Sequence, residues 1–230
     1  MRARTLLLFL AVSLLAGCAS TPAPDSTADT APPPVMAPPA LAPPSAVAAA
    51  VGKFDVALAA PGRTDADRER DGRDHPAEVL ALAGFGPGMV IGDVFGGGGY
   101  YSEILSNVVG PTGRVRLVNN PSYDNYAKKT LEPRLAGGRL ANVDYAMVQP
   151  DALGLGTATL DGALIVMSYH DLYFAEPKEG WPPIDAGQFI DQLVAALKPG
   201  ATLLIVDHQA RAGSGHADTQ VLHRIEDTYA

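Results

Sequence analysis

The sequence predicts an α/β fold with a doubly wound, mostly parallel sheet and helices on both faces. From residue 89 onward, apolar runs that suit buried strands alternate with segments of helical periodicity. One apolar run, Met89 to Val94, leads into four consecutive glycines, Gly96 to Gly99, and then into a helical pattern. A strand, a glycine turn and a helix form the first unit of such a sheet, whose ligands bind beyond the carboxyl ends of the strands.

The four glycines indicate a site for a nucleotide-like cofactor. Glycine adopts positive φ without strain and lets a ligand approach the backbone closely. The alternative is a merely flexible loop, but flexible loops do not normally fall between a strand and a helix of matching periodicity.

The remaining elements follow in alternation up to a clear stop. Lys198-Pro199-Gly200 ends the most regular helix and precedes the last buried strand. We expect strands over residues 89–94, 114–118, 143–148, 160–167 and 201–206, and helices over 75–82, 100–109, 123–135, 184–197 and 219–230. Few residues follow the fifth strand, so the sheet is expected to be truncated there, with an exposed edge.

The N-terminal region predicts an exported lipoprotein. Arg2 and Arg4 precede an apolar run, and Leu15-Ala16-Gly17-Cys18 resembles a bacterial lipobox, so residues 1–18 are expected to be a lipoprotein signal peptide. Cys18, the sole cysteine, would then carry a lipid anchor in the cell envelope, and Ala19 after it suggests the outer membrane, facing the periplasm. The plainer interpretation is an incidental cysteine behind an ordinary signal peptide.

The amino-acid composition predicts a spacer followed by a folded domain. Residues 19–60 are rich in Pro and Ala and are expected to be a disordered linker, and residues 61–230 are expected to form the domain. The chain has a formal net charge of −8, and loss of Arg2 and Arg4 would leave 15 basic against 25 acidic residues, or −10. This acidity argues against nucleic-acid binding, which needs a basic face.

A run of charged residues from Arg63 to Asp74 precedes the domain's first expected helix. Such a run usually forms a solvated helical face, and the alternative is a lid over the cofactor pocket. His75, before Pro76, is expected to cap or pack rather than to react.

The order of these motifs resembles class I S-adenosylmethionine-dependent methyltransferases, and most closely bacterial exported "predicted methyltransferase" proteins. The resemblance covers residues 75 to 225 and is carried by these segments: Asp93 to Tyr100, Tyr169-His170-Asp171, Gly180-Trp181-Pro182-Pro183, Leu197 to Gly200 and Val206-Asp207-His208. It implies a Rossmann-like fold and methyl transfer from S-adenosyl-L-methionine to an unknown small-molecule acceptor.

The resemblance also implies which residues would bind the cofactor. Asp93 would hold the methionine portion, and the glycine loop would pass close to its carboxylate and ribose. Asn119 stands where an acid usually takes the ribose hydroxyls, and Asp151 would receive the adenine amino group unless it only caps a helix. The cofactor-binding set is thus Asp93, Gly96, Gly97, Gly98, Gly99, Tyr100, Asn119 and Asp151.

Two departures from known patterns accompany this assignment. Phe95 replaces the first glycine of the common Asp-x-Gly-x-Gly-x-Gly pattern. A nicotinamide-dependent dehydrogenase is disfavoured, because Tyr100-Tyr101-Ser102 follows the loop without the third dinucleotide glycine.

Catalytic chemistry is expected directly after the fourth strand, at Tyr169, His170 and Asp171. A histidine there could act as a general base, since its unperturbed pKa lies near neutrality. A polar residue that only satisfies the strand end is the plainer alternative, more so for His208. A zinc site formed by His170, His208 and an acidic residue is conceivable, but no two histidines have a helical ligand spacing, so we do not assign a metal. The rival to an enzyme is a non-catalytic lipoprotein that uses this fold to bind a ligand or an envelope partner.

Overall fold

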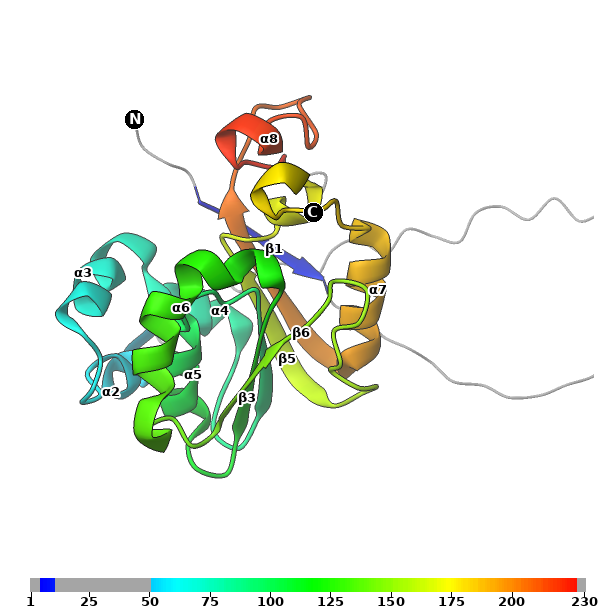
Figure 1. The fold of residues 1–230 in the computed structure, drawn as a ribbon. Coiled ribbons are helices and arrows are strands. Elements are labelled where there is room, and N and C mark those ends of the chain that lie inside the picture. Colours follow the sequence, from blue (N-terminus) through cyan, green and yellow to red (C-terminus); the bar gives the residue numbers. More distant parts are fainter. Residues whose placement is uncertain (1–4, 11–50, 227–230) are drawn as a thin grey trace, which may run out of the picture.

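The computed structural model of the 230-residue chain describes residues 5–10 and 51–226. Its centre is a six-stranded sheet of order β1-β6-β5-β2-β3-β4 (Figure 1). The strands are β1 (Thr5–Leu10), β2 (Val90–Val94), β3 (Arg114–Asn119), β4 (Val143–Met147), β5 (Leu160–Val166) and β6 (Leu197–His208). Strands β2 to β6 pair in parallel, so the predicted five-stranded parallel sheet is confirmed.

Helices cover both faces of this sheet, as expected. The main helices are α2 (Asp55–Leu58), α3 (Asp65–Asp74), α4 (Pro76–Ala83), α5 (Tyr100–Val109), α6 (Pro121–Leu135), α7 (Ala186–Ala196) and α8 (Thr219–Leu222). One core packs α2, α4 and α5 against the sheet, and the other packs α7 and the start of α6 against the opposite face. Each amphipathic helix thereby buries its apolar side, which is the main favourable term in folding.

The folded part begins earlier than the composition suggested. A 3-10 turn, Gly52–Phe54, and α2 lie within the segment that we expected to be linker. Phe54 and Ala57 are buried in the α2–α4–α5 core, so this stretch contributes to packing. Cys18 and residues 11–50 of the leader and linker lie outside the described residues.

In the uncleaved chain the edge of β6 is paired, whereas we expected an unpaired edge. β1 pairs antiparallel with β6, from Thr5 opposite His208 to Leu10 opposite Leu203. These six residues belong to the segment predicted to be a signal peptide. Cleavage before Cys18 would therefore remove the partner of β6.

The C-terminal helix is also shorter than predicted. α8 ends at Leu222, because His223 adopts the left-handed conformation with φ of 49°. Ile225 then forms a parallel bridge with Gln209. Among the described residues, no helix has the length and apolarity needed to cross a bilayer.

Candidate functional site

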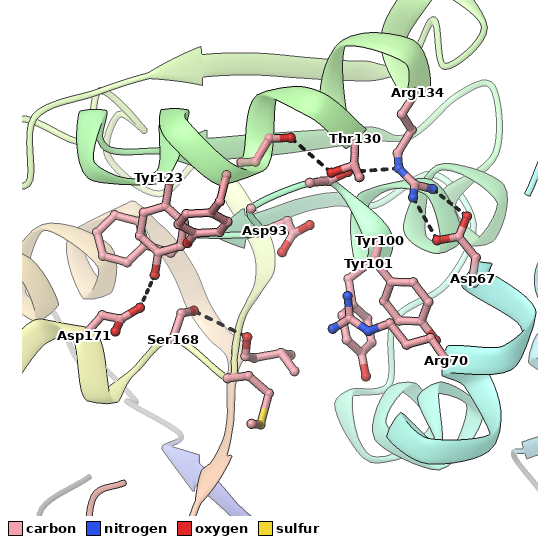
Figure 2. A pocket seen from close by; sticks show the side chains of 18 of the residues that line it. Asp67, Arg70, Asp93, Tyr100, Tyr101, Tyr123, Thr130, Arg134, Ser168 and Asp171 are labelled. Atoms are coloured by element: carbon pink, nitrogen blue, oxygen red, sulfur yellow. Dashed lines mark hydrogen bonds and ion pairs between the residues drawn. The ribbon is translucent and has the colours of Figure 1, made fainter. Parts of the chain in front are cut away.

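A cavity of about 390 Å³ lies at the carboxyl ends of β2 and β5 (Figure 2). It is bounded by α3, by the glycine loop and the start of α5, by α6, and by the segment after β5. Its walls are Ala66, Asp67, Arg70, Asp93, Phe95, Gly96, Gly97, Gly98, Tyr100, Tyr101, Tyr123, Tyr126, Ala127, Thr130, Arg134, Val166, Met167, Ser168 and Asp171. This volume falls within the range of small-molecule sites.

The glycine loop is shaped by close packing on both sides. A Cβ on Gly96 would lie 2.5 Å from the carboxylate of Asp93, and one on Gly98 would overlap Thr130 Oγ1 of α6. At Gly97 the nearest atom would be in the ring of Tyr126, 3.9 Å away, and φ is +55°. Gly97 is therefore the position where the backbone faces open space and where a ligand could come close.

Phe95, which stands in place of the first glycine of the usual pattern, adopts a backbone conformation typical of glycine. Its φ is 54°, in the left-handed region that glycine normally occupies, and its side chain is buried. The ring centroid lies 4.9 Å from that of Tyr123 and 5.0 Å from that of Phe189. The side chain thus contributes to the core without filling the loop. Met167, after β5, has φ of 58° and also lines the cavity. Non-glycine residues held in this region are concentrated at functional sites.

Asp93 is a buried carboxylate at the end of β2. The Ser102 hydroxyl donates a hydrogen bond from Oγ to Oδ2 of Asp93 at 2.6 Å. Burial raises the pKa of Asp93 from 3.8 to about 6, although the hydrogen bonds from Ser102 and the charge of Arg70 oppose the shift. Among the described residues Asp93 forms no ion pair, so the cavity contains a negative group that lacks a bound cation.

Asn119 does not occupy the position of a ribose ligand. Its Oδ1 accepts a 2.9 Å hydrogen bond from Gly97 N, and its Nδ2 donates a 3.0 Å bond to Gly97 O. The side chain is buried and does not line the cavity. Both halves of the amide hold the glycine loop in place, which corrects the assignment that we made from its position in the sequence.

Asp151 is also removed from the cavity. It is exposed, in the tight turn where Gln149 bridges to Ala152 after β4. The lining residues come from α3, α6 and the ends of β2 and β5, and Asp151 is not one of them. Asn119 and Asp151, which we expected at the adenosine end, thus do not line the cavity, whereas the rings of Tyr123 and Tyr126 do.

The charge run forms α3, and one side of this helix borders the cavity, where a lid over a cofactor stays a prediction. Asp67 and Arg70 line the cavity. The Arg70 guanidinium lies 4.0 Å from the ring centroid of Tyr100, and the Tyr100 hydroxyl donates a 2.5 Å hydrogen bond to Asp71. Tyr100 therefore contributes to the cavity wall and also holds α3 in place.

Arg134, from α6, was not singled out in the sequence. It donates to Gly98 O at 2.9 Å and to Asp67 Oδ1 at 2.8 Å, and Figure 2 shows its contact with Asp67. It also pairs with Glu103 of α5. One buried guanidinium of α6 thus contacts α3, the glycine loop and α5. No local pattern marks such a residue, because its partners are distant in the chain.

The predicted catalytic triplet divides into three different environments. Asp171 lines the cavity, and its Oδ2 accepts a 2.5 Å hydrogen bond from the Tyr123 hydroxyl. Tyr169 is buried in the core beside Tyr173. His170 lies behind Asp171 and does not line the cavity.

His170 is not a free base in this arrangement. Its Nδ1 is 2.8 Å from Asp207 Oδ1, and its Nε2 is 3.2 Å from Asp171 Oδ1. Burial lowers its pKa, but the hydrogen bonds and charges of the two carboxylates outweigh burial and raise the pKa from 6.5 to about 9. At neutral pH His170 is thus a cation between two carboxylates, which corrects its assignment as a general base.

A second cavity, of about 450 Å³, adjoins the first. Arg70, Tyr101, Val166 and Met167 line both, and His208 lines the second. The Tyr101 hydroxyl is buried without a hydrogen-bond partner among the described residues. An unpaired buried hydroxyl is costly, so a polar group of a ligand would satisfy it.

Comparison with known proteins identifies methyltransferases. The chain is 26% identical over 130 residues to the ubiquinone/menaquinone biosynthesis C-methyltransferase of Hydrogenovibrio crunogenus, covering 56% of this chain and 46% of that protein. The chain thus spans less than half the length of this curated relative. No protein-family model matches it.

Solved structures of the same kind align with the chain. A SAM-dependent methyltransferase from Aquifex aeolicus aligns with a TM-score of 0.47 and 25% identity, over 65% of this chain and 77% of that one. An arsenic(III) methyltransferase from Chlamydomonas reinhardtii aligns with a TM-score of 0.44 and 19% identity, over 75% and 52%. Because both scores are low, the fold assignment depends on the strand order observed here. The order β6-β5-β2-β3-β4 of the parallel strands agrees with the Rossmann-like methyltransferase fold that we expected.

Proposed function

We propose that this chain transfers a methyl group from S-adenosyl-L-methionine to a small-molecule acceptor. The observation that carries the proposal is the buried Asp93 carboxylate, which lies beside the glycine loop and lacks a cationic partner among the described residues. The ammonium group of the cofactor's methionine portion is the cation that would compensate it. The bound cofactor would supply an electrophilic methyl group.

The residues fit one end of this cofactor better than the other. Asp93, the open backbone at Gly97 and the N-terminus of α5 suit an amino acid's ammonium and carboxylate groups. Asn119 and Asp151, which we expected to bind the adenosine portion, do not line the cavity. We infer that the exposed face of Tyr126 and the ring of Tyr123 would stack on the adenine base instead.

The second cavity would bind the acceptor. Val79, Leu82, Val166 and Val206 give it an apolar wall, and the Tyr101 hydroxyl is available for a hydrogen bond. An acceptor with an apolar body and one polar end would fit this combination. Because the curated relative acts in ubiquinone and menaquinone biosynthesis, a hydroquinone is the first acceptor to test.

Calorimetric titration of the folded full chain with S-adenosyl-L-methionine and with S-adenosylhomocysteine tests the proposal. Saturable binding of both is expected, followed by transfer of a labelled methyl group to a hydroquinone. If neither compound produces heat on titration or shifts the thermal unfolding of the chain, the proposal that the chain is a methyltransferase is contradicted.

A non-catalytic binding protein is the second candidate. It is favoured by the engagement of both Asn119 amide atoms with Gly97 and by the exposed position of Asp151, because the expected adenosine contacts are missing. A chain that binds neither cofactor compound yet is stabilised by a hydroquinone would support this alternative.

We also propose that Cys18 carries a lipid anchor and places the domain at the cell envelope, in the outer membrane facing the periplasm. The support is the sequence Leu15-Ala16-Gly17-Cys18 behind a basic and apolar leader. Incorporation of labelled palmitate into the chain, and its loss in Cys18→Ser, would test the anchor. Equal labelling of both chains would contradict it.

A further inference from the structure

A chain of four polar side chains lies at the ends of β5 and β6. Asp207 Oδ1 and Oδ2 are 2.8 and 3.0 Å from Nδ1 of His170. The same carboxylate is fixed from behind, because the backbone N–H groups of His170 and His208 donate to it at 2.9 and 2.7 Å. This arrangement orients the imidazole with Nδ1 toward Asp207 and Nε2 toward the opposite side.

Asp171 lies on that opposite side and is oriented in the same manner. Its Oδ1 is 3.2 Å from Nε2 of His170, and its Oδ2 accepts a hydrogen bond from the Tyr123 hydroxyl at 2.5 Å. Tyr123 therefore fixes one carboxylate oxygen and leaves the other directed at the imidazole. Figure 2 shows the Tyr123–Asp171 contact at the edge of the cavity.

A second histidine approaches from the C-terminal segment. The ring centroids of His223 and His170 are 5.4 Å apart, and His223 is exposed in the turn that ends α8. One ligand atom each from His170, Asp171 and His223 lies within 4.8 Å of the other two, and this is the one such group of potential metal ligands among the residues whose side chains the structure describes.

We propose that His170, Asp171 and His223 bind a zinc ion, and that Asp207 and Tyr123 position the first two ligands. Tetrahedral zinc with bonds of about 2.0–2.1 Å places neighbouring ligand atoms about 3.3 Å apart. The separation of His170 Nε2 and Asp171 Oδ1, 3.2 Å, already matches this value. A ligand atom of His223 lies within 4.8 Å of both atoms, and the side chain of His223 is exposed.

The surrounding hydrogen bonds distinguish this cluster from an ordinary ion pair. Metal-binding histidines typically donate their other ring N–H to a carboxylate, and metal-binding carboxylates are themselves hydrogen-bonded. His170 has Asp207 in that position, and Asp171 has Tyr123. Two imidazoles and one carboxylate suit zinc, and three protein ligands leave a fourth position for water or a ligand. Because Asp171 lines the first cavity, the ion would lie at its edge.

Metal content and affinity of the full chain test this site without reference to methyl transfer. After removal of metals with a chelator, equilibrium dialysis against zinc chloride is expected to load one ion per chain. His223→Asn retains a residue that tolerates the left-handed backbone of this turn but removes the imidazole. It is expected to weaken zinc binding at least tenfold, and so is Asp207→Asn, the change in a positioning residue.

His75→Asn is the matched control, because His75 is exposed, has a similar backbone conformation with φ of 47°, and lies outside the cluster. It should leave zinc binding unchanged. X-ray absorption of the loaded chain should show two imidazole ligands and one or more oxygen ligands. Zinc binding that is equal in the wild type and in His223→Asn, or no loading of the folded wild type, would overturn the proposal. The cluster would then be an ion pair between protonated His170 and the carboxylates of Asp171 and Asp207.

Discussion

Asp93 and Asp207 are buried carboxylates at the ends of β2 and β6, and different groups compensate their negative charges. Asp93, at the end of β2, has Ser102 as its hydrogen-bonding side chain and a pKa raised to about 6. Asp207, at the end of β6, lies against His170, which also contacts Asp171. Asp93 forms no ion pair among the described residues, although Arg70 and Arg134 line the same cavity, whereas Asp207 is paired with His170. A buried negative charge without an internal partner indicates where a cationic ligand group binds.

The largest expected effect comes from removing the internal cation of the second region. His170→Ala would leave Asp171 and Asp207 buried without their shared partner. Breaking a buried pair from one side costs about 3–5 kcal/mol. Urea unfolding in the presence of a chelator should show this loss, whereas exposed His75→Asn should change stability by less than about 0.5 kcal/mol. A neutral His170→Ala would show that the network is not an ion pair.

In the first region, replacing the carboxylate of Asp93 is expected to stabilise the ligand-free chain, whereas His170→Ala destabilises it. Because the folded pKa of Asp93 is raised from 3.8 to about 6, its contribution to stability is lost as pH rises between these values. Asp93→Asn should therefore stabilise the ligand-free chain at pH 7 by up to about 3 kcal/mol. Urea unfolding at pH 7 and pH 4 measures this, and the gain should largely vanish at pH 4. Equal destabilisation at both values would contradict the account.

A smaller loss of stability is expected when the close packing of the glycine loop is disturbed. Gly98→Ala would place a Cβ against Thr130 Oγ1 and should cost about 1–3 kcal/mol. Adding Thr130→Ala should restore part of the loss, since the overlapping atom is removed. The control is Gly72→Ala in α3, where a Cβ meets no atom within 4 Å and helix propensity should give a gain of about 0.5–1 kcal/mol. Thermal unfolding of the four chains ranks these effects.

The parts of the fold predicted from sequence are those with strong local signals. The helix over residues 100–109 was predicted with its observed bounds, because glycines precede it and Gly110 ends it. The parallel order of β2 to β6 follows from alternation of strands and helices. The pairing of β1 with β6 could not be predicted, because it joins residues about 200 positions apart.

The candidate site was predicted less completely, for the same physical reason. Asp93 and the glycine loop are neighbours in sequence, and the structure keeps them together. Asn119 has the right position for a ribose ligand, but only the folded loop shows that Gly97 engages both of its amide atoms. The cluster of His170, Asp171 and His223 escaped a search based on helical spacing, because the two histidines come from different turns.

The central claim is that Asp93 binds the ammonium group of the cofactor, and titration with S-adenosyl-L-methionine at pH 8 and pH 5 tests it most directly. Asp93→Asn should weaken binding roughly 30-fold or more at pH 8, because a buried charged hydrogen bond loses one partner. Wild-type affinity should fall about tenfold at pH 5, where protonation leaves about a tenth of the Asp93 side chains ionised. Binding that is insensitive to both the substitution and the pH would contradict the claim.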